Sequence, residues 1–195
     1  MATARTPRLA WVDAGLRALA AGGPDAVRVE ALARDLHVTK GGFYGFFDDR
    51  RAQLGEMLDT WERRSTTDAI ERAENEGGDA LTRTQRAADL TFSPDLLPVD
   101  LAVRDWARRD PSVAARLARV DNQRMEYLRS HFRSAFTDPA DLEARCLLAF
   151  SAAIATDLIA ADHPDQTRDE VLAQAASLLF SEQARAAHAV ADHRI

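Results

Sequence analysis

Apolar residues recur at spacings of three and four along almost the whole chain. Leu9, Val12, Leu16 and Leu19 show this pattern near the N-terminus. Such spacing places side chains on one face of an α-helix, whereas a half-buried strand needs apolar residues at every second position. Because no segment shows that alternation, the sequence predicts an all-α protein.

Capping residues and glycines divide the N-terminal half into helices. The expected helices cover about 7–21, 29–36, 40–46 and, as one long fourth helix, 49–75. Asp48-Asp49 would cap the fourth helix through a carboxylate that accepts a backbone N–H. The glycines at 77–78 would end it.

Prolines mark several later helix starts. Ser93-Pro94, Asp110-Pro111 and Asp138-Pro139 each place a capping residue before a proline at the first helical position. The segment 167–170 (Thr-Arg-Asp-Glu) matches a capping box. We expect five helices after the long one, and about nine in all.

Residues 28–47 have the features of a helix-turn-helix. Ala33 is small enough to face a second helix closely, and Val38 would anchor the turn. Thr39 can cap the next helix through its hydroxyl. In this motif the second helix lies in the major groove of DNA, so the segment predicts DNA binding.

The residue types at the start of that second helix fit this function. Lys40, the only lysine of the chain, places a flexible cation at the exposed end. Gly41 and Gly42 each cost roughly 1 kcal/mol of helix stability relative to Ala. Their lack of side chains would let the backbone approach DNA closely, which accounts for that cost.

Three further side chains extend the expected DNA-facing surface. The Tyr44 hydroxyl can donate to a phosphate. Arg50 and Arg51 open the next helix, where cations oppose the helix dipole. Their placement there indicates an external anion such as a DNA phosphate.

The charge distribution also favours a DNA-binding head. The chain has a net charge of −6, yet residues 1–51 hold eight Lys/Arg against six Asp/Glu. An acidic body would repel DNA except through such a head. An acidic surface that only keeps the protein in solution explains the body equally well.

The segment 38–54 resembles the TetR family of bacterial repressors. Val38, Lys40, Gly41, Tyr44, Phe47 and Leu54 match that family's signature outright, and Thr39, Phe43 and Arg50 are conservative substitutions. The clear resemblance covers about residues 9–61. It implies a helix-turn-helix head at 1–50 and a ligand-binding and dimerisation domain at 51–195.

The resemblance implies roles for individual residues. Phe43 and Phe47 would pack in the core of the head. The predicted DNA-binding residues are Arg28, Thr39, Lys40, Gly41, Gly42, Tyr44, Arg50 and Arg51.

Four positions depart from the family's pattern. His37 stands in the turn in place of Gly, which adds strain because the turn needs a left-handed backbone. Arg28 replaces the usual capping Thr or Ser, and Gly45 replaces a bulky residue. Glu30 would repel phosphate or accept from a cytosine amine. The DNA sequence that is bound is therefore harder to predict than DNA binding itself.

The resemblance further implies a homodimer that binds an operator in double-stranded DNA and responds to a small-molecule effector. The last two strong helices, about 139–161 and 167–188, carry apolar stripes and many alanines. Two such helices from each protomer could form a four-helix bundle about a two-fold axis. Part of each stripe must also serve the core of the single chain.

The effector site is expected among large apolar side chains with a few polar groups. The predicted ligand-binding residues are Trp61, Phe92, Arg104, Trp106, Met125, Leu128, Phe132 and Phe150. Asp105 could supply a further polar group. Core packing is the alternative for each aromatic residue. A bound ligand would act through the long fourth helix, which links the body to the head.

Other classes of protein find less support. No apolar run of ~18 residues is present, and the N-terminus lacks the apolar core of a signal peptide, so a cytoplasmic protein without membrane contact is expected. Cys146 is the single cysteine, which excludes a disulfide framework and a multi-cysteine metal site. We expect no catalytic residue, cofactor or metal.

Two alternatives stay open at this point. A helical-bundle enzyme is the first, although Glu-x-x-His spacing and a Walker glycine loop are absent. His188 and Asp192 are four apart but lie in the tail, and the tripeptide 163–165 (His-Pro-Asp) is interpreted as a turn. A helical scaffold that has lost DNA binding is the second, favoured by Glu30 and Gly45.

Overall fold

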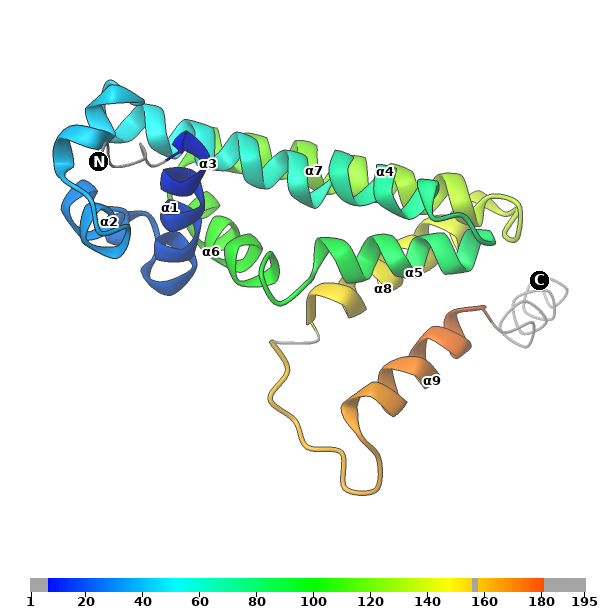
Figure 1. Ribbon diagram of the computed structural model, residues 1–195. Helices are drawn as coiled ribbons and strands as arrows, with labels where there is room; N and C mark the ends of the chain where they lie inside the picture. Colours follow the sequence, from blue (N-terminus) through cyan, green and yellow to red (C-terminus); the bar gives the residue numbers. More distant parts are fainter. Residues whose placement is uncertain (1–6, 156–157, 181–195) are drawn as a thin grey trace, which may run out of the picture. The chain divides into compact units, whose positions relative to one another are not determined.

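The computed structural model describes residues 7–155 and 158–180, and within them the chain forms α-helices and two short 3₁₀ helices, with no strand. The elements are α1 (Arg8–Gly22), η1 (Pro24–Ala26), α2 (Val29–Asp35), η2 (Lys40–Gly45), α3 (Arg50–Ser65), α4 (Thr67–Asn75), α5 (Ala80–Thr91), α6 (Leu97–Ala107), α7 (Pro111–Phe132), α8 (Pro139–Ala155) and α9 (Arg168–Phe180). The predicted all-α fold is confirmed. The chain divides into two compact units, Met1–Tyr127 and Leu128–Ile195 (Figure 1).

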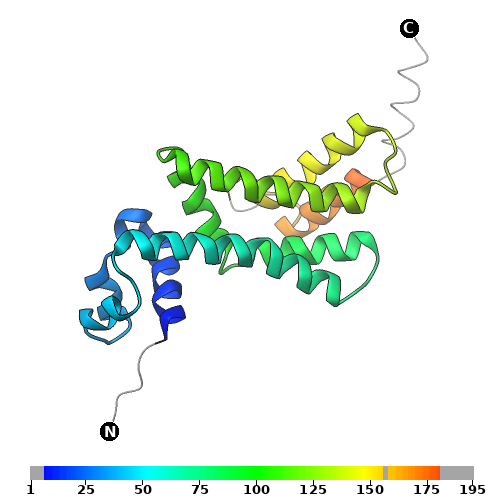
Figure 2. The same cartoon turned by 90° about the horizontal axis from the view of Figure 1, so that it is seen from above.

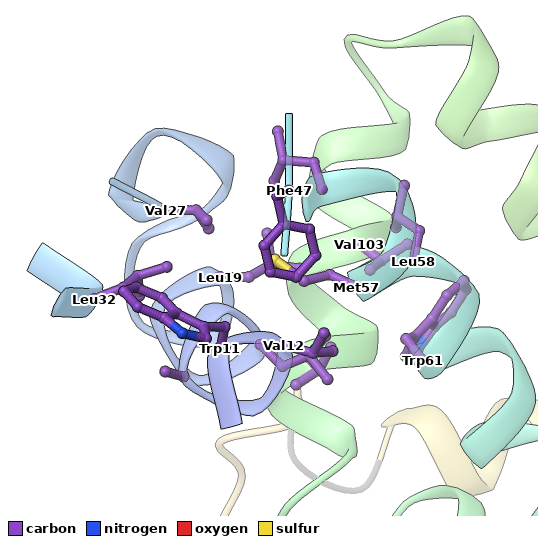
Figure 3. Close-up of a cluster of buried hydrophobic side chains, with 14 of the residues drawn as sticks. Trp11, Val12, Leu19, Val27, Leu32, Phe47, Met57, Leu58, Trp61 and Val103 are labelled. Atoms are coloured by element: carbon purple, nitrogen blue, oxygen red, sulfur yellow. The ribbon is translucent and has the colours of Figure 1, made fainter. Parts of the chain in front are cut away.

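The core of the first unit forms where α1 packs against α3 and α6. Figure 3 shows this core with labelled side chains from all three helices and from the segments between them: Trp11, Val12, Leu19, Val27, Leu32, Phe47, Met57, Leu58, Trp61 and Val103. Gly15 permits the close approach of α1 to α3, because a Cβ at this position would lie 2.5 Å from the sulfur of Met57. The apolar face predicted for α1 is buried except for Leu9, which is exposed in the first turn.

The predicted long fourth helix is two helices, α3 and α4. The chain leaves helical geometry at Thr66, whose φ and ψ are −132° and −86°. The hydroxyl of Thr66 donates to the carbonyl of Glu62 over 2.6 Å. Such bonding of a threonine to the preceding turn bends helices. α4 nevertheless continues roughly in the direction of α3 (Figure 2).

Most of the predicted helix starts are confirmed by their capping bonds. Asp49, Asp110 and Asp138 each accept a backbone N–H from the first turn of the following helix, at 2.7–2.9 Å. The capping box before α9 has both of its bonds, between Thr167 and Glu170. The start predicted at 93–94 is wrong: Pro94 lies in a turn, and α6 begins at Leu97.

Within the second unit, α8 and α9 contact each other. The guanidinium of Arg145 on α8 binds Asp141 at 2.9 Å and the carbonyl of Leu179 on α9. It also lies 4.2 Å from the ring centroid of Phe136. Both helices are shorter within the described residues than predicted, and residues 181–188 of the expected last helix, with His188 and Asp192, lie outside them.

Candidate nucleic-acid interface

The turn between α2 and η2 is a Schellman motif. The N–H of His37 donates to the carbonyl of Arg34 over 3.1 Å, and the N–H of Val38 donates to that of Ala33 over 2.9 Å. His37 has a φ of 56°, so it holds the left-handed conformation that a Schellman motif requires. His37, a residue with a side chain, thus occupies the left-handed position that Gly adopts most readily. The backbone strain predicted at His37 arises at this position.

The segment after the turn separates buried from exposed side chains. Phe43 is fully buried, its ring 5.5 Å from that of Trp11 and 5.1 Å from that of Phe47. Tyr44, the next residue, is 63% exposed. The predicted core roles of Phe43 and Phe47 are confirmed, and η2 has an exposed side as well as a buried one.

The backbone of η2 differs from the prediction in its winding. An α-helix was expected at about 40–46, whereas Lys40–Gly45 is a 3₁₀ helix. Three of its six residues are glycines, which weaken an α-helix. Thr39 occupies the expected N-cap position, but its side chain makes no capping hydrogen bond.

Gly41 and Gly42 are not required by the packing of the protein itself. A Cβ on Gly41 would meet its nearest neighbour, the Thr39 hydroxyl, at 3.7 Å, and one on Gly42 would meet Trp11 at 3.7 Å. Both distances are ordinary van der Waals contacts, and neither glycine has a positive φ. Within the folded chain, neither side-chain packing nor backbone conformation requires a glycine at either position.

Lys40 forms an ion pair with Glu30, which is the second residue of α2. Both side chains are more than half exposed, at 53% for Lys40 and 60% for Glu30. The hydrogen bond from Lys40 lowers the pKa of Glu30, and the same bond raises the pKa of Lys40. Lys40, which was expected to attract DNA, and Glu30, which was expected to repel its phosphates, thus bind each other.

The three arginines of the predicted site differ in their surroundings. Arg50 is half-buried and donates from Nε to the carbonyl of Val27 over 2.7 Å, and from Nη2 to that of Pro24. Arg28 is exposed and donates to the carbonyl of Asp25 over 3.0 Å. Arg51 is exposed. Arg50 thus holds the start of α3 against the loop that precedes α2.

Three of the predicted ligand-binding residues, Trp61, Phe92 and Arg104, lie at a network around a buried carboxylate in the first unit that the sequence did not indicate. Asp100 on α6 is fully buried and accepts from Trp61 Nε1 at 3.2 Å. It also accepts from Arg124 at 2.8 Å and from Arg104 at 2.8 Å. Asp100 therefore connects α3, α6 and α7.

Further contacts extend this network. Arg104 donates to both oxygens of Asp121, at 2.8 and 2.9 Å. Burial lowers the pKa of Arg104, but the bond to Asp121 and the charges of Asp121 and Asp100 raise it further than burial lowers it. The guanidinium of Arg124 lies 5.2 Å from the ring centroid of Phe92. The two buried charges, Asp100 and Arg124, pair with each other, as buried charges must, and the half-buried Arg104 and Asp121 each add an ion pair to one of them.

The remaining predicted ligand residues are distributed over both units. Trp106 packs against the core of the first unit, and Met125 is buried there. Leu128, Phe132 and Phe150 belong to the second unit, where Phe132 is buried. Asp105, expected to serve the ligand site, is exposed and pairs with Arg109.

The buried Asp100 and Arg124 and the half-buried Asp121 were missed for an identifiable reason. All three are charged, and charged residues are rarely found in a core, so nothing in the sequence pattern indicated them. The only signal was their spacing: Asp100 and Arg104 are four apart, and Asp121 and Arg124 three apart. Such spacing allows pairing on a helix face but does not tell a buried face from an exposed one.

Metal sites and membrane spans are not found in the described part of the chain. Its His, Cys, Asp and Glu side chains form no group of three that could hold a metal ion. None of its helices combines the length and hydropathy that crossing a membrane requires.

Comparison with known families bears directly on the helix-turn-helix. Residues 12–57, from the middle of α1 to the middle of α3, match the family described as bacterial regulatory proteins, tetR family. The predicted resemblance to this family is therefore confirmed over the segment that contains the helix-turn-helix.

Solved structures extend the similarity of fold to most of the chain. The TetR-family regulator PfmR from Thermus thermophilus has 17% identity and a TM-score of 0.63, over 87% of this chain and 96% of its own. A regulatory protein of the family from Rhodococcus RHA1 has 18% identity and a TM-score of 0.64, over 90% and 96%. At such identities these matches establish the fold only. Among curated proteins, none is significantly similar in sequence.

Proposed function

We propose that this chain is a DNA-binding transcriptional regulator of the tetR family, a ligand-responsive repressor that binds a palindromic operator as a homodimer and is released by a small molecule. Residues 1–50 would read DNA, and 51–195 would bind the ligand and dimerise. The observation that carries the proposal is the division of η2: Phe43 is buried while Lys40 and Tyr44 are exposed beside it.

The exposed side of η2 supports insertion into the major groove. Lys40 and Tyr44 offer a cation and a hydroxyl, the groups that position a protein on phosphates. Gly41 and Gly42 would bring the backbone close to the DNA. The other proposed contacts come from the ends of the neighbouring helices: Arg28, Thr39, Arg50 and Arg51.

The exposed apolar side chains of the second unit support the dimer. Leu147 and Leu148 on α8 and Leu178 on α9 are each more than half exposed in the single chain. Such side chains on two helices in contact are typical of a surface that a partner covers. A second copy, joined through α8 and α9 in a four-helix bundle, is the proposed occupant.

The buried network supports a route from ligand to head. Trp61 and Arg104, both proposed as ligand contacts, bind the same carboxylate, Asp100. Asp100 lies on α6, which packs against α1 of the head. A ligand that favours one arrangement of these helices would change the separation of the two DNA-reading segments of a dimer. Phe92, Trp106, Met125, Leu128, Phe132 and Phe150 complete the proposed set.

A gel-shift titration tests DNA binding. The probes are the region upstream of the protein's own gene and a scrambled duplex of equal length, at several salt concentrations. We expect saturable, salt-sensitive binding to the first probe and its loss on Lys40→Ala with Tyr44→Ala. Arg108→Ala, which removes an exposed cation just after the end of α6, serves as a control and should bind like the wild type. Retained binding by the double variant would refute the assignment of these residues.

Light scattering after gel filtration tests the dimer. Leu147→Glu with Leu178→Glu places charges on the proposed interface and should yield monomers. Leu81→Glu, at an exposed leucine on α5, should leave a dimer. Monomers in the wild type would contradict the proposed dimer. They would not contradict DNA binding, which a single head could still carry out.

A helical adaptor without DNA binding is the second candidate. One observation favours it: Glu30 forms an ion pair with Lys40, the cation that DNA binding would need. No shift of any duplex at low salt, where phosphate contacts are strongest, would decide for the adaptor.

A further inference from the structure

The ion pair between Glu30 and Lys40 lies between the two helical segments of the helix-turn-helix. Glu30 is at the start of α2 and Lys40 at the start of η2, ten residues later and beyond the turn. In a docked helix-turn-helix the first helix crosses the DNA backbone and the second lies in the groove. A carboxylate at the start of α2 therefore lies where a phosphate is expected.

The chemistry of the pair matches that of a lysine–phosphate contact. A carboxylate and a phosphate both accept charge-assisted hydrogen bonds from an ammonium group. Lys40 is the only lysine, and the half-buried Arg50 is engaged with carbonyls of the protein. The cation of η2 that could reach a phosphate is thus held by an acid of the same motif.

Resting on the proposed DNA binding through η2, we infer that Glu30 competes with DNA for Lys40 and lowers the affinity of the head for duplex DNA of any sequence. In the free protein the Lys40 ammonium binds the Glu30 carboxylate. On DNA it binds a phosphate, and Glu30 is left beside other phosphates that repel it. Glu30 thus weakens nonspecific binding, which depends almost entirely on phosphate contacts.

The pair also affects the salt dependence of binding. A lysine already neutralised by a carboxylate adds less to the release of counterions than a lone lysine does. Each phosphate that a cation neutralises contributes a slope of about −0.9 to the logarithm of affinity against the logarithm of salt concentration. Removing the charge of Glu30 should therefore steepen the slope by up to about 0.9.

Four forms of the full chain test the inference: the wild type, Glu30→Gln, Lys40→Met and the double variant. Affinity is measured by fluorescence anisotropy for the upstream duplex and the scrambled duplex, from about 50 to 200 mM salt, the range over which phosphate contacts weaken strongly. Glu30→Gln should raise affinity for both duplexes by about two- to fivefold, the range that an exposed ion pair spans. Against a Lys40→Met background, the same change should have a smaller effect.

Asp35→Asn is the matched control. Asp35 is the last residue of α2 and pairs with Arg17 over 2.8 Å, with both side chains exposed. This variant changes the net charge by the same amount, so its effect measures the general gain from a less acidic protein. Glu30→Gln should exceed it in both affinity and slope.

Four outcomes would overturn the inference. Three of them are an unchanged or weaker affinity of Glu30→Gln, an equal gain with and without Lys40, and an effect confined to one duplex, which would assign Glu30 to base reading. If neither the wild type nor any variant binds either duplex, the proposed function fails as well. A wild type that binds, with Glu30→Gln indistinguishable from Asp35→Asn, refutes the inference alone.

Discussion

Arg50 donates from Nε to the carbonyl of Val27 over 2.7 Å and thereby fastens the first turn of α3 to the segment that precedes α2. Val27 is itself fully buried. The bond therefore joins α3 to the part of the chain that leads into the helix-turn-helix. Arg50 has a structural role here, whatever contact it makes with DNA.

Replacing Arg50 by Met should destabilise the protein. The change removes the donor to the Val27 carbonyl and one of two donors to the Pro24 carbonyl, which still accepts from the N–H of Val27. A hydrogen bond to a charged group is worth about 1.5–3 kcal/mol. We expect a loss of about 2 kcal/mol in denaturant unfolding. Arg51→Met removes the same charge from the exposed neighbouring residue and should leave stability nearly unchanged. An equal loss in both variants would contradict the structural role of Arg50.

Gly41→Ala should separate the stability of the fold from DNA binding. The structure has room for the added methyl group, and Ala favours helical backbone over Gly, so stability should rise by about 0.5–1 kcal/mol. If the backbone of η2 approaches DNA closely, affinity should fall by at least about fivefold, the effect of about 1 kcal/mol of overpacking.

Gly55→Ala is the control for this prediction. Gly55 lies within α3, and a Cβ there would have no neighbour within 4 Å. Its substitution should stabilise the protein to a similar extent and leave gel shifts unchanged. Full DNA affinity in Gly41→Ala would show that these glycines do not serve DNA approach.

The sequence predicted most of the elements that a local signal determines, although the helix start expected at Ser93-Pro94 was wrong. Caps at Asp49, Asp110 and Asp138 each depend on a side chain and a backbone N–H two or three residues away. The buried positions of Phe43 and Phe47 were expected from the resemblance to the tetR family. The break at Thr66 could have been anticipated, because three consecutive residues at 65–67 carry β-hydroxyl groups that compete with helical bonding.

Partners that are distant in sequence could not be predicted in this way. Nothing local indicates that Arg50 bonds to Val27 or that Lys40 pairs with Glu30. Exposure in a single chain is also not determined by periodicity. Leu147 belongs to an apolar helix face and is nevertheless more than half exposed, because that stripe extends beyond the core of its unit.

His37→Gly should stabilise the protein modestly. A left-handed backbone costs a residue with a side chain roughly 1–2 kcal/mol, whereas Gly adopts it without penalty but loses more entropy on folding. The expected net gain is about 0.5–1 kcal/mol in thermal or denaturant unfolding. His37→Ala retains the penalty and serves as the comparison. Equal stability of the Gly and Ala variants would argue against strain at this turn.

Asp100→Asn should destabilise the protein strongly. The substitution keeps an oxygen that can accept from Trp61, but removes the negative charge that balances the buried Arg124. Breaking a buried ion pair from one side costs about 3–5 kcal/mol. Asp105→Asn, at an exposed carboxylate of the same helix, should have little effect. A loss below about 1 kcal/mol would indicate that Asp121 alone balances both Arg104 and Arg124.

Asp110→Asn should flatten the acid dependence of stability. Hydrogen bonds from the Ser112 side chain and from the backbone N–H groups of Ser112 and Val113 lower the pKa of Asp110 below its ordinary value of 3.8. A lowered pKa means that the charged carboxylate stabilises the folded protein at pH values above 3.8, its ordinary pKa. This stabilisation is lost as the pH falls through the lower pKa of the folded state. Asn can still accept the capping bonds but does not titrate. Thermal unfolding followed from pH 6 to about pH 3 should therefore show a smaller decline in the variant, and an unchanged decline would assign the acid sensitivity to other carboxylates.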